Sequence, residues 1–380
     1  MIKAITSLSL ILIIASGYAL LSCESKNSNQ GEGIDNLEIQ LKWYPSYPDE
    51  SREDVEVGLL WILSYLGEPI NERNYQDYMT WEMDDVLLLD IDNLVHKSSR
   101  RKLWSNIITE IESHSNDNVV DVGRFVFETF NRSEVYYQLT EMPTRLSEYL
   151  KLHGLKNDQE FAVSKGESCV SPGFRLFEST DSKNKLLDIA YTAQEGTGSK
   201  IEDFEAKEVE VMDFMANGQP RFGVYDLDGS LLPGADADIT IAGKPAKCMW
   251  CHTSQVQPLI FAVSDIEGFE TRDSFVSLIK NQNRVRRRYL RSTDQDFILD
   301  SLRQHSLAEL LYFTYEYPTP QRLISEGYSQ KQVKSLSYHQ NIEYLFYDLE
   351  FDSMVHRHAI DPTFKRTSRE TVWSENVLRH

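Results

Sequence analysis

The chain has 380 residues, of which 41% are apolar and 11% aromatic, which is typical of a folded protein with room for two domains or three small ones. Its formal net charge of -20 disfavours nucleic acid and anionic lipid surfaces as partners, because both would repel the molecule as a whole. Four cysteines are too few for a disulfide framework, so each of them needs its own explanation.

The N-terminus resembles a bacterial lipoprotein signal. Lys3 precedes an apolar stretch over residues 5–21 that is too short to span a bilayer comfortably. The stretch ends in Leu-Leu-Ser before Cys23, which resembles the lipobox, where cleavage leaves a cysteine to be acylated. We expect removal of residues 1–22 and a lipid anchor on Cys23. An ordinary cleaved signal with a chance cysteine is the alternative.

Residues 23–45 are expected to form a flexible tether, because the run from Glu24 to Gly33 is rich in Ser, Asn, Gly and Glu. No later segment is apolar for long enough to cross a membrane. The sequence therefore predicts a lipid-anchored protein of the bacterial cell envelope, with the outer membrane as the expected location. It leaves open whether the protein faces the periplasm or the outside.

Residues 46–155 are predicted to form a helical domain. Residues 54–66 are apolar almost all round, and Ser51 followed by Asp54 gives a capping-box-like opening to that helix. Apolar residues recur at helical spacing from Leu103 to Ile111, and further helices are predicted over residues 119–130 and 135–152.

Residues 156–266 are predicted to form a small antiparallel β-rich domain. The expected strands cover residues 174–177, 186–191, 208–215 and 221–225. Asn217-Gly218 is typical of a hairpin turn between the last two strands, and a second turn is expected from Asp226 to Gly229. The fold class is therefore α+β.

Residues 267–345 are predicted to form a C-terminal helical region, with helices over residues 275–290 and 296–315 and a third that opens at Thr319-Pro320. Residues 322–336 superficially resemble a DNA-binding helix-turn-helix, but an acidic exported chain makes a structural role the better interpretation. Residues 346–380 are expected to be a polar tail.

The segment Cys248-Met249-Trp250-Cys251-His252 matches the C-x-x-C-H signature of c-type haem attachment. Two thiols one helical turn apart can add to the two vinyl groups on one edge of a porphyrin, and the following histidine then lies beneath the iron. Haem attachment takes place outside the cytoplasm, where the signal would deliver the chain. We therefore expect one covalent haem c held by Cys248 and Cys251, with His252 as an axial iron ligand.

Two other interpretations of the motif stay open. A structural zinc site would need a second pair of ligands, and the remaining thiols are Cys23 and the isolated Cys169. A C-x-x-C disulfide is possible outside the cytoplasm, although no thioredoxin-like strand and helix surround it. Cys169 itself is expected to be a small buried residue rather than a reactive thiol.

The order of strand, tight turn, strand, loop and C-x-x-C-H over residues 174–263 is similar to that of the hydroxylamine-oxidising "460-type" cytochromes and cytochrome c′-β. The resemblance implies thioethers at Cys248 and Cys251 and a proximal ligand at His252. The lysine crosslink to the porphyrin in that family has no assignable counterpart among Lys183, Lys185, Lys200 and Lys207. Without the crosslink, the resemblance implies binding of small ligands such as nitric oxide, or electron transfer.

The sixth ligand of the iron is open on sequence grounds. The candidates are His305, His339, His356, His358, Met212, Met215 and Met354. Met212 and Met215 should lie on opposite faces of one strand, so at most one of them could approach the haem. For each candidate, a core or surface role is the simpler interpretation.

Two charged features of the sequence have more than one interpretation. The basic run of Arg284, Arg286, Arg287, Arg288 and Arg291 could pair with haem propionates or dock a redox partner, but a solvated helix face is the simpler interpretation. The acidic pairs Asp226/Asp228 and Asp236/Asp238 could suggest calcium, although no complete twelve-residue calcium loop follows.

The leading functional prediction is electron transfer in the cell envelope through a single haem. The expected partners are the membrane, through the N-terminal lipid, and a redox protein, with no role for nucleic acid. Two alternatives remain open. One is a haem enzyme or gas-binding protein with a five-coordinate iron, and the other is a surface-binding lipoprotein without haem. Whether the protein is an enzyme is left undecided.

Overall fold

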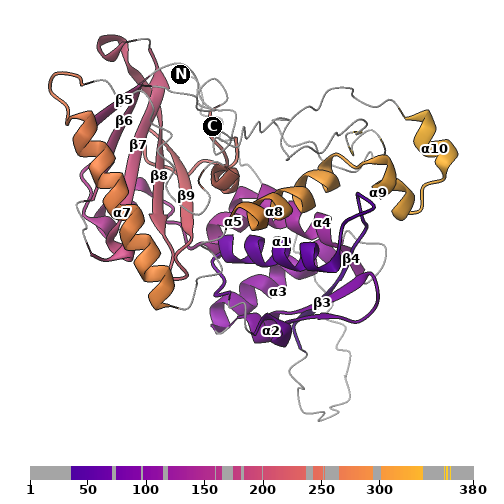
Figure 1. The fold of residues 1–380 in the computed structure, drawn as a ribbon. Helices are drawn as coiled ribbons and strands as arrows, with labels where there is room; N and C mark the ends of the chain where they lie inside the picture. The colour runs from indigo at the N-terminus through magenta and orange to yellow at the C-terminus, as the bar shows by residue number, and fades with distance from the viewer. Residues whose placement is uncertain are drawn as a thin grey trace, which may run out of the picture. The chain divides into compact units, whose positions relative to one another are not determined.

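The computed structural model describes two sheets and the helices that pack on them (Figure 1). The described residues are 36–70, 74–95, 97–113, 119–158, 160–164, 174–180, 184–198, 200–236, 243–250, 252, 265–293, 301–336, 355, 357 and 360. Helices and antiparallel or mixed sheets occur together, so the α+β prediction is confirmed. Cys23, Cys169 and Cys251 lie outside the described residues.

The first sheet has four strands in the order β2-β3-β1-β4. The strands are β1 (Glu38–Lys42), β2 (Met79–Trp81), β3 (Val86–Asp90) and β4 (Val119–Asp121). β1 is an inner strand, antiparallel to β3 and parallel to β4, so the prediction of a flexible tether over residues 23–45 is wrong for Glu38–Lys42. The prediction of one helix from residue 119 is wrong at its start, because Val119 and Val120 are β-branched and pair with β1. Asp121 then caps the helix that follows, with its carboxylate accepting from the Gly123 and Arg124 backbone N–H groups.

The helices around this sheet cover most of the region predicted to be helical. They are α1 (Arg52–Tyr65), α2 (Ile91–Leu94), α3 (Ser98–Ser113), α4 (Val122–Asn131), α5 (Ser133–Leu139) and α6 (Leu146–His153). The capping box between Ser51 and Asp54 is confirmed at the start of α1. α1 is buried along most of its length, and it packs on α8 (Ser301–Glu316).

The second sheet has five antiparallel strands in chain order. The strands are β5 (Phe161–Ser164), β6 (Phe174–Ser179), β7 (Ala190–Thr197), β8 (Glu205–Phe214) and β9 (Pro220–Asp226). The Asn217-Gly218 turn between β8 and β9 is confirmed, and Gly218 has φ of +82°, which glycine adopts without strain. The Asn217 side chain donates to the Ser64 and Glu68 carbonyls, which fixes this turn to the end of α1.

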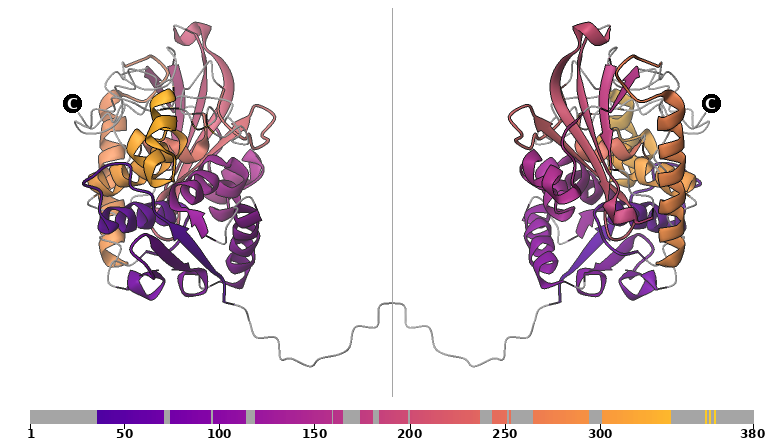
Figure 2. Two further views of the ribbon diagram at one scale, coloured as in Figure 1. Left: turned by 90° about the vertical axis from the view of Figure 1, so that its right-hand side faces the viewer. Right: turned by 90° about the vertical axis from the view of Figure 1, so that its left-hand side faces the viewer.

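Helix α7 (Arg272–Ser292) lies along one face of the five-stranded sheet (Figure 2). Phe275 packs edge-on against Phe161 and Phe177, and Gln282 accepts from the Tyr191 hydroxyl at 2.6 Å. These strand residues share one face of the sheet. Phe161 pairs with Phe177, and Tyr191 pairs with the residue two positions after Phe177. On the opposite face, Asp213 binds His153 at the end of α6. The five-stranded sheet is therefore covered by a helix on each side.

The hydrophobic core is continuous across the region boundaries expected at residues 155 and 266, because buried residues of α1, β8, α7 and α8 belong to one cluster. Two short helices follow α8, namely α9 (Pro320–Ser325) and α10 (Gln330–Ser335). The helix start at Thr319-Pro320 is confirmed, with the Thr319 hydroxyl accepting from the Arg322 N–H. Within the segment expected to be a polar tail, Arg357 is buried.

Candidate functional site

The C-x-x-C-H segment begins on a short 3-10 helix, η4 (Pro245–Trp250), which packs against β9, α4 and α5. Ala246 and Met249 are fully buried on it. The His252 backbone N–H donates to the Cys248 carbonyl at 3.0 Å, so the chain makes one helical turn from the first cysteine to the histidine. Cys251, the second cysteine of the motif, lies outside the described residues.

Lys247 fixes the motif to the helices behind it. Its side chain is buried, and the ammonium lies 5.1 Å from the centre of the Tyr312 ring. Burial lowers the pKa of Lys247, and the nearby Glu316 carboxylate opposes that shift. The Tyr312 hydroxyl in turn donates to the Asn131 side-chain oxygen at 3.2 Å. Helices α8 and α4 thus hold the residue that directly precedes the first motif cysteine.

Cys248 is half-buried and packs against the hydrophobic core. The ring of His252 lies 5.5 Å from that of Phe222 on β9, at an angle of 37°. His252 Nδ1 is buried and has no hydrogen-bond partner within the described part of the chain. Burial, followed by the positive charge of Arg175, lowers the pKa of His252 to about 4. The imidazole is therefore neutral at pH 7, which is the form that binds a metal.

Three carboxylates lie on the sheet face that carries Phe222. Glu195 on β7 pairs with Glu208 on β8, and Glu210 is two residues further along the same face. Ligand oxygens of the three carboxylates lie within 4.8 Å of one another, and Glu195 and Glu208 are buried. Arg175 on β6 forms an ion pair with Glu195 and also lowers the pKa of His252. Arg175 therefore interacts electrostatically with both the motif histidine and the carboxylate group.

The ionisation of this carboxylate group is strongly perturbed. Burial, followed by the charge of Glu210, raises the pKa of Glu208 to about 8. Burial raises the pKa of Glu195 well above the ordinary carboxyl value, against the influence of Arg175. Protonation of Glu208, or a cation bound between the carboxylates, would relieve the repulsion within the group. The group could hold a divalent cation, and sequence analysis missed it because it depends on strand register.

No protein-family model, no curated protein and no solved structure matches this chain. The functional interpretation therefore depends on the residues of the site itself. In the described part of the chain, no helix combines the length and the apolar character needed to cross a bilayer.

Of the candidate sixth ligands, Met212 lies opposite Phe222 on the neighbouring strand. Met212 is buried on β8 and pairs across the strands with Phe222, the residue that contacts His252. Met215 comes after the end of β8, beside Gly67, while His305 is buried in α8 with Nε2 3.3 Å from Glu309. His339, His356, His358 and Met354 lie outside the described residues.

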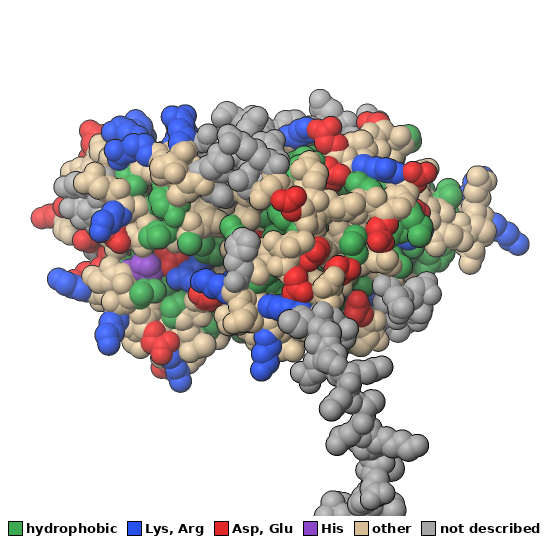
Figure 3. Space-filling model, turned by 90° about the horizontal axis from the view of Figure 1, so that it is seen from below, with side chains coloured by type: hydrophobic (Ala, Val, Ile, Leu, Met, Phe, Trp, Pro, Cys, Tyr) green, Lys and Arg blue, Asp and Glu red, His purple; other side chains and the backbone are tan. Residues whose placement is uncertain are grey.

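The basic run is divided between surface and core. Arg286 is buried and donates to the Gly218 carbonyl and the Gln219 side-chain oxygen, which fixes α7 to the β8–β9 turn. The other members of the run are exposed on α7, which agrees with a solvated helix face. They are Arg284, Arg287, Arg288 and Arg291. Side chains of both charges are interspersed over the face seen in Figure 3.

Two further features of the sequence have local roles in the structure. Lys185, Lys200 and Lys207 are exposed, and Lys183 lies outside the described residues. Asp226 accepts from the Ser230 N–H at 2.7 Å and so stabilises the turn expected after β9, while Asp238 lies outside the described residues.

Proposed function

We propose that this chain is a lipid-anchored c-type cytochrome that transfers electrons in the bacterial cell envelope. The observation that carries the proposal is the motif turn itself, in which His252 is neutral and its buried Nδ1 has no hydrogen-bond partner within the described part of the chain. Leaving such a nitrogen unsatisfied is costly, and a metal-ligating histidine commonly uses one nitrogen for the metal and the other for a nearby acceptor.

The residues present fit a covalently attached haem. Cys248 and Cys251 would form the two thioether bonds, and His252 would be an axial ligand of the iron. When bound, the haem supplies reversible one-electron chemistry at the iron. Cys248, in the second half of η4, is only partly buried, which would leave room for attachment of a cofactor.

The surroundings of the motif would set the environment of the iron. Met249 and Phe222 are buried and exclude water from the side of the site next to the core. Arg175 supplies positive charge near His252. A positive charge there would favour the form of the cofactor that carries less positive charge. The Lys247 contact with Tyr312 on α8 would hold the residue that precedes the first cysteine in place.

The membrane anchor is the second part of the proposal. It rests on the lipobox-like residues before Cys23 and on the polar tether that follows them. An anchored one-electron carrier would stay close to membrane-bound donors and acceptors, which raises their effective concentration.

The decisive experiment is a pyridine haemochrome spectrum of protein produced together with a haem c maturation system. We expect a c-type spectrum that survives acid-acetone extraction, and an altered or absent one for Cys248→Ala and Cys251→Ala. Cys169→Ala is the matched control, because it removes a thiol outside the motif, and its spectrum should equal that of the natural sequence. A colourless natural protein would show that the haem assignment is wrong.

The anchor is tested separately by feeding cells a labelled fatty acid. We expect the label in the natural protein and none in Cys23→Ala, while haem attachment is unchanged. Incorporation that persists in Cys23→Ala would contradict the anchor without affecting the haem assignment.

A further inference from the structure

The carboxylates of Glu195, Glu208 and Glu210 converge on one face of the five-stranded sheet. Glu195 on β7 lies opposite Glu208 on β8, and Glu210 is the next residue of β8 on that face. One oxygen from each residue lies within 4.8 Å of the other two. No member of the group belongs to the C-x-x-C-H motif, so its use would not depend on the haem.

A buried oxygen of this group lacks a hydrogen-bond partner. Glu208 is only 1% exposed, and its Oε2 accepts the Asp236 backbone N–H at 2.7 Å. Its Oε1 is also buried, but it has no hydrogen-bond donor within the described part of the chain. Glu195 is equally buried, and its described contact is the ion pair with Arg175. A carboxylate oxygen removed from water without a partner is costly, and a cation beside it would remove that cost.

The charges of the group do not balance. When all are ionised, the three carboxylates carry three negative charges and Arg175 offsets one, which leaves two in excess. Asp236 adds to the negative field, because its charge acts to raise the pKa of Glu208. Two protons or one divalent cation would neutralise the excess of the three carboxylates.

The spacing suits an ion that lies between the carboxylates. Calcium lies about 2.3–2.6 Å from its oxygen ligands, so ligands on opposite sides of it are about 4.6–5.2 Å apart. The three oxygens are already close enough to contact one such ion, which would reach them without an open pocket. Glu210 is only half-buried, so its side of the group provides a route for the ion and room for bound water.

The donor atoms indicate which cation would bind. Among the described residues, the ligand atoms gathered here are carboxylate oxygens, without a histidine nitrogen or a thiol. Oxygen ligands favour hard cations, whereas zinc and copper prefer nitrogen and sulfur. Two paired strands hold Glu195 and Glu208, and calcium accepts an irregular arrangement of ligands more readily than magnesium does.

We infer that Glu195, Glu208 and Glu210 form a binding site for one calcium ion. The ion would contact the buried oxygens from the side of Glu210, while Arg175 holds the Glu195 carboxylate. Binding would join β7 to β8 through their side chains and would displace protons from the group.

The test is isothermal titration calorimetry with calcium chloride on the full haem-loaded chain after treatment with a chelator. About 0.15 M potassium chloride screens the exposed carboxylates. We expect saturable binding of one ion per chain, with an affinity that rises from about pH 6 to about pH 8. The rise is expected because the ion displaces protons from Glu195 and Glu208, whereas exposed carboxylates are already ionised over this range.

Glu208→Gln should weaken calcium binding at least about tenfold, because it removes a charged ligand. The amide oxygen can still accept the Asp236 N–H, so the variant should fold. Glu210→Gln changes the half-buried ligand and should also weaken binding. Glu205→Gln is the matched control, because it removes an equal charge from an exposed residue of the same strand, and its calcium affinity should equal that of the natural protein.

Absence of saturable calcium binding at pH 8 would overturn the inference. So would an affinity that does not change with pH, or equal weakening by Glu208→Gln and Glu205→Gln, since both indicate binding to exposed carboxylates only. The same titration of colourless protein gives the same readout, so failure here is distinct from failure of the haem proposal.

Discussion

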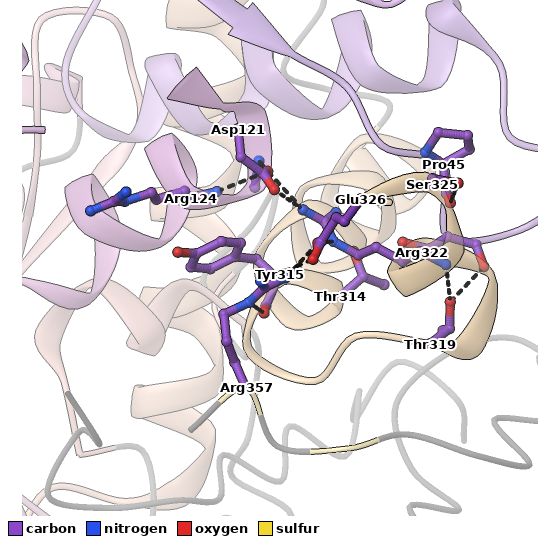
Figure 4. A network of polar contacts seen from close by, with 12 residues as sticks. Pro45, Asp121, Arg124, Thr314, Tyr315, Thr319, Arg322, Ser325, Glu326 and Arg357 are labelled. Atoms are coloured by element: carbon purple, nitrogen blue, oxygen red, sulfur yellow. Dashed lines mark hydrogen bonds and ion pairs between the residues drawn. The ribbon is translucent and has the colours of Figure 1, made fainter. Parts of the chain in front are cut away.

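Replacing Arg322 with methionine should destabilise the protein strongly, because this buried arginine joins two carboxylates (Figure 4). Its Nη2 lies 2.7 Å from Asp121 Oδ1 and its Nε lies 2.9 Å from Glu326 Oε1, while Arg357 binds the same Glu326 oxygen at 2.6 Å. The four charges balance, and Arg322→Met leaves one negative charge in excess. Removal of one partner from a buried ion pair costs about 3–5 kcal/mol.

Arg303→Met is the matched control. Arg303 also contacts two carboxylates, those of Glu53 and Asp54, at 3.1 and 3.0 Å, but its side chain is 59% exposed. Exposed ion pairs contribute about 0–1 kcal/mol, so this variant should unfold close to the natural midpoint. Urea unfolding followed by fluorescence of the buried Trp61 and Trp104 measures both changes. Losses of similar size for the two variants, or a loss below about 1 kcal/mol for Arg322→Met, would refute the reasoning.

Two further predictions concern the sheet and the first helix. The pKa of Glu208 is raised to about 8, so the stability that depends on its protonated form is complete below the ordinary carboxyl value and is lost as pH rises through 8. The urea midpoint of Glu208→Gln should therefore rise relative to that of the natural protein between pH 5 and 9. A difference between the two midpoints that does not change with pH would contradict the raised pKa of Glu208. Gly58→Ala should lower the melting temperature, because its Cβ would lie 2.9 Å from the Leu307 carbonyl oxygen, and overpacking of this kind costs about 1–3 kcal/mol. A melting temperature equal to the natural one would show that α8 can move away.

Features set by neighbouring residues were predictable from the sequence. The Ser51 capping box, the Asn217-Gly218 turn and the helix start at Thr319 depend on side chains within three residues of the backbone groups that they organise. The C-x-x-C-H motif was found for the same reason, because its turn is local.

Features that depend on distant pairing were missed. β4 has only three residues, and it is a strand because β1 lies beside it, so its own pattern could not be distinguished from the start of α4. The approach of Arg175 to Glu195, and of Phe222 to His252, follows from the strand register and from the path of the chain after β9. The burial of Arg357 follows from its stacking at 4.2 Å on Tyr315, a partner 42 residues earlier in the chain.

The packing of α1 on α8 has a consequence for how the protein is made. α1 is apolar on nearly all sides, and the ion pair of Glu53 with Arg303 shows that its neighbours on α8 come 250 residues later. During synthesis or export that starts at the N-terminus, the face of α1 that packs on α8 stays uncovered until residues 301–316 have emerged. Folding of this protein should therefore be slow, and it should depend on chaperones that shield α1 until α8 arrives.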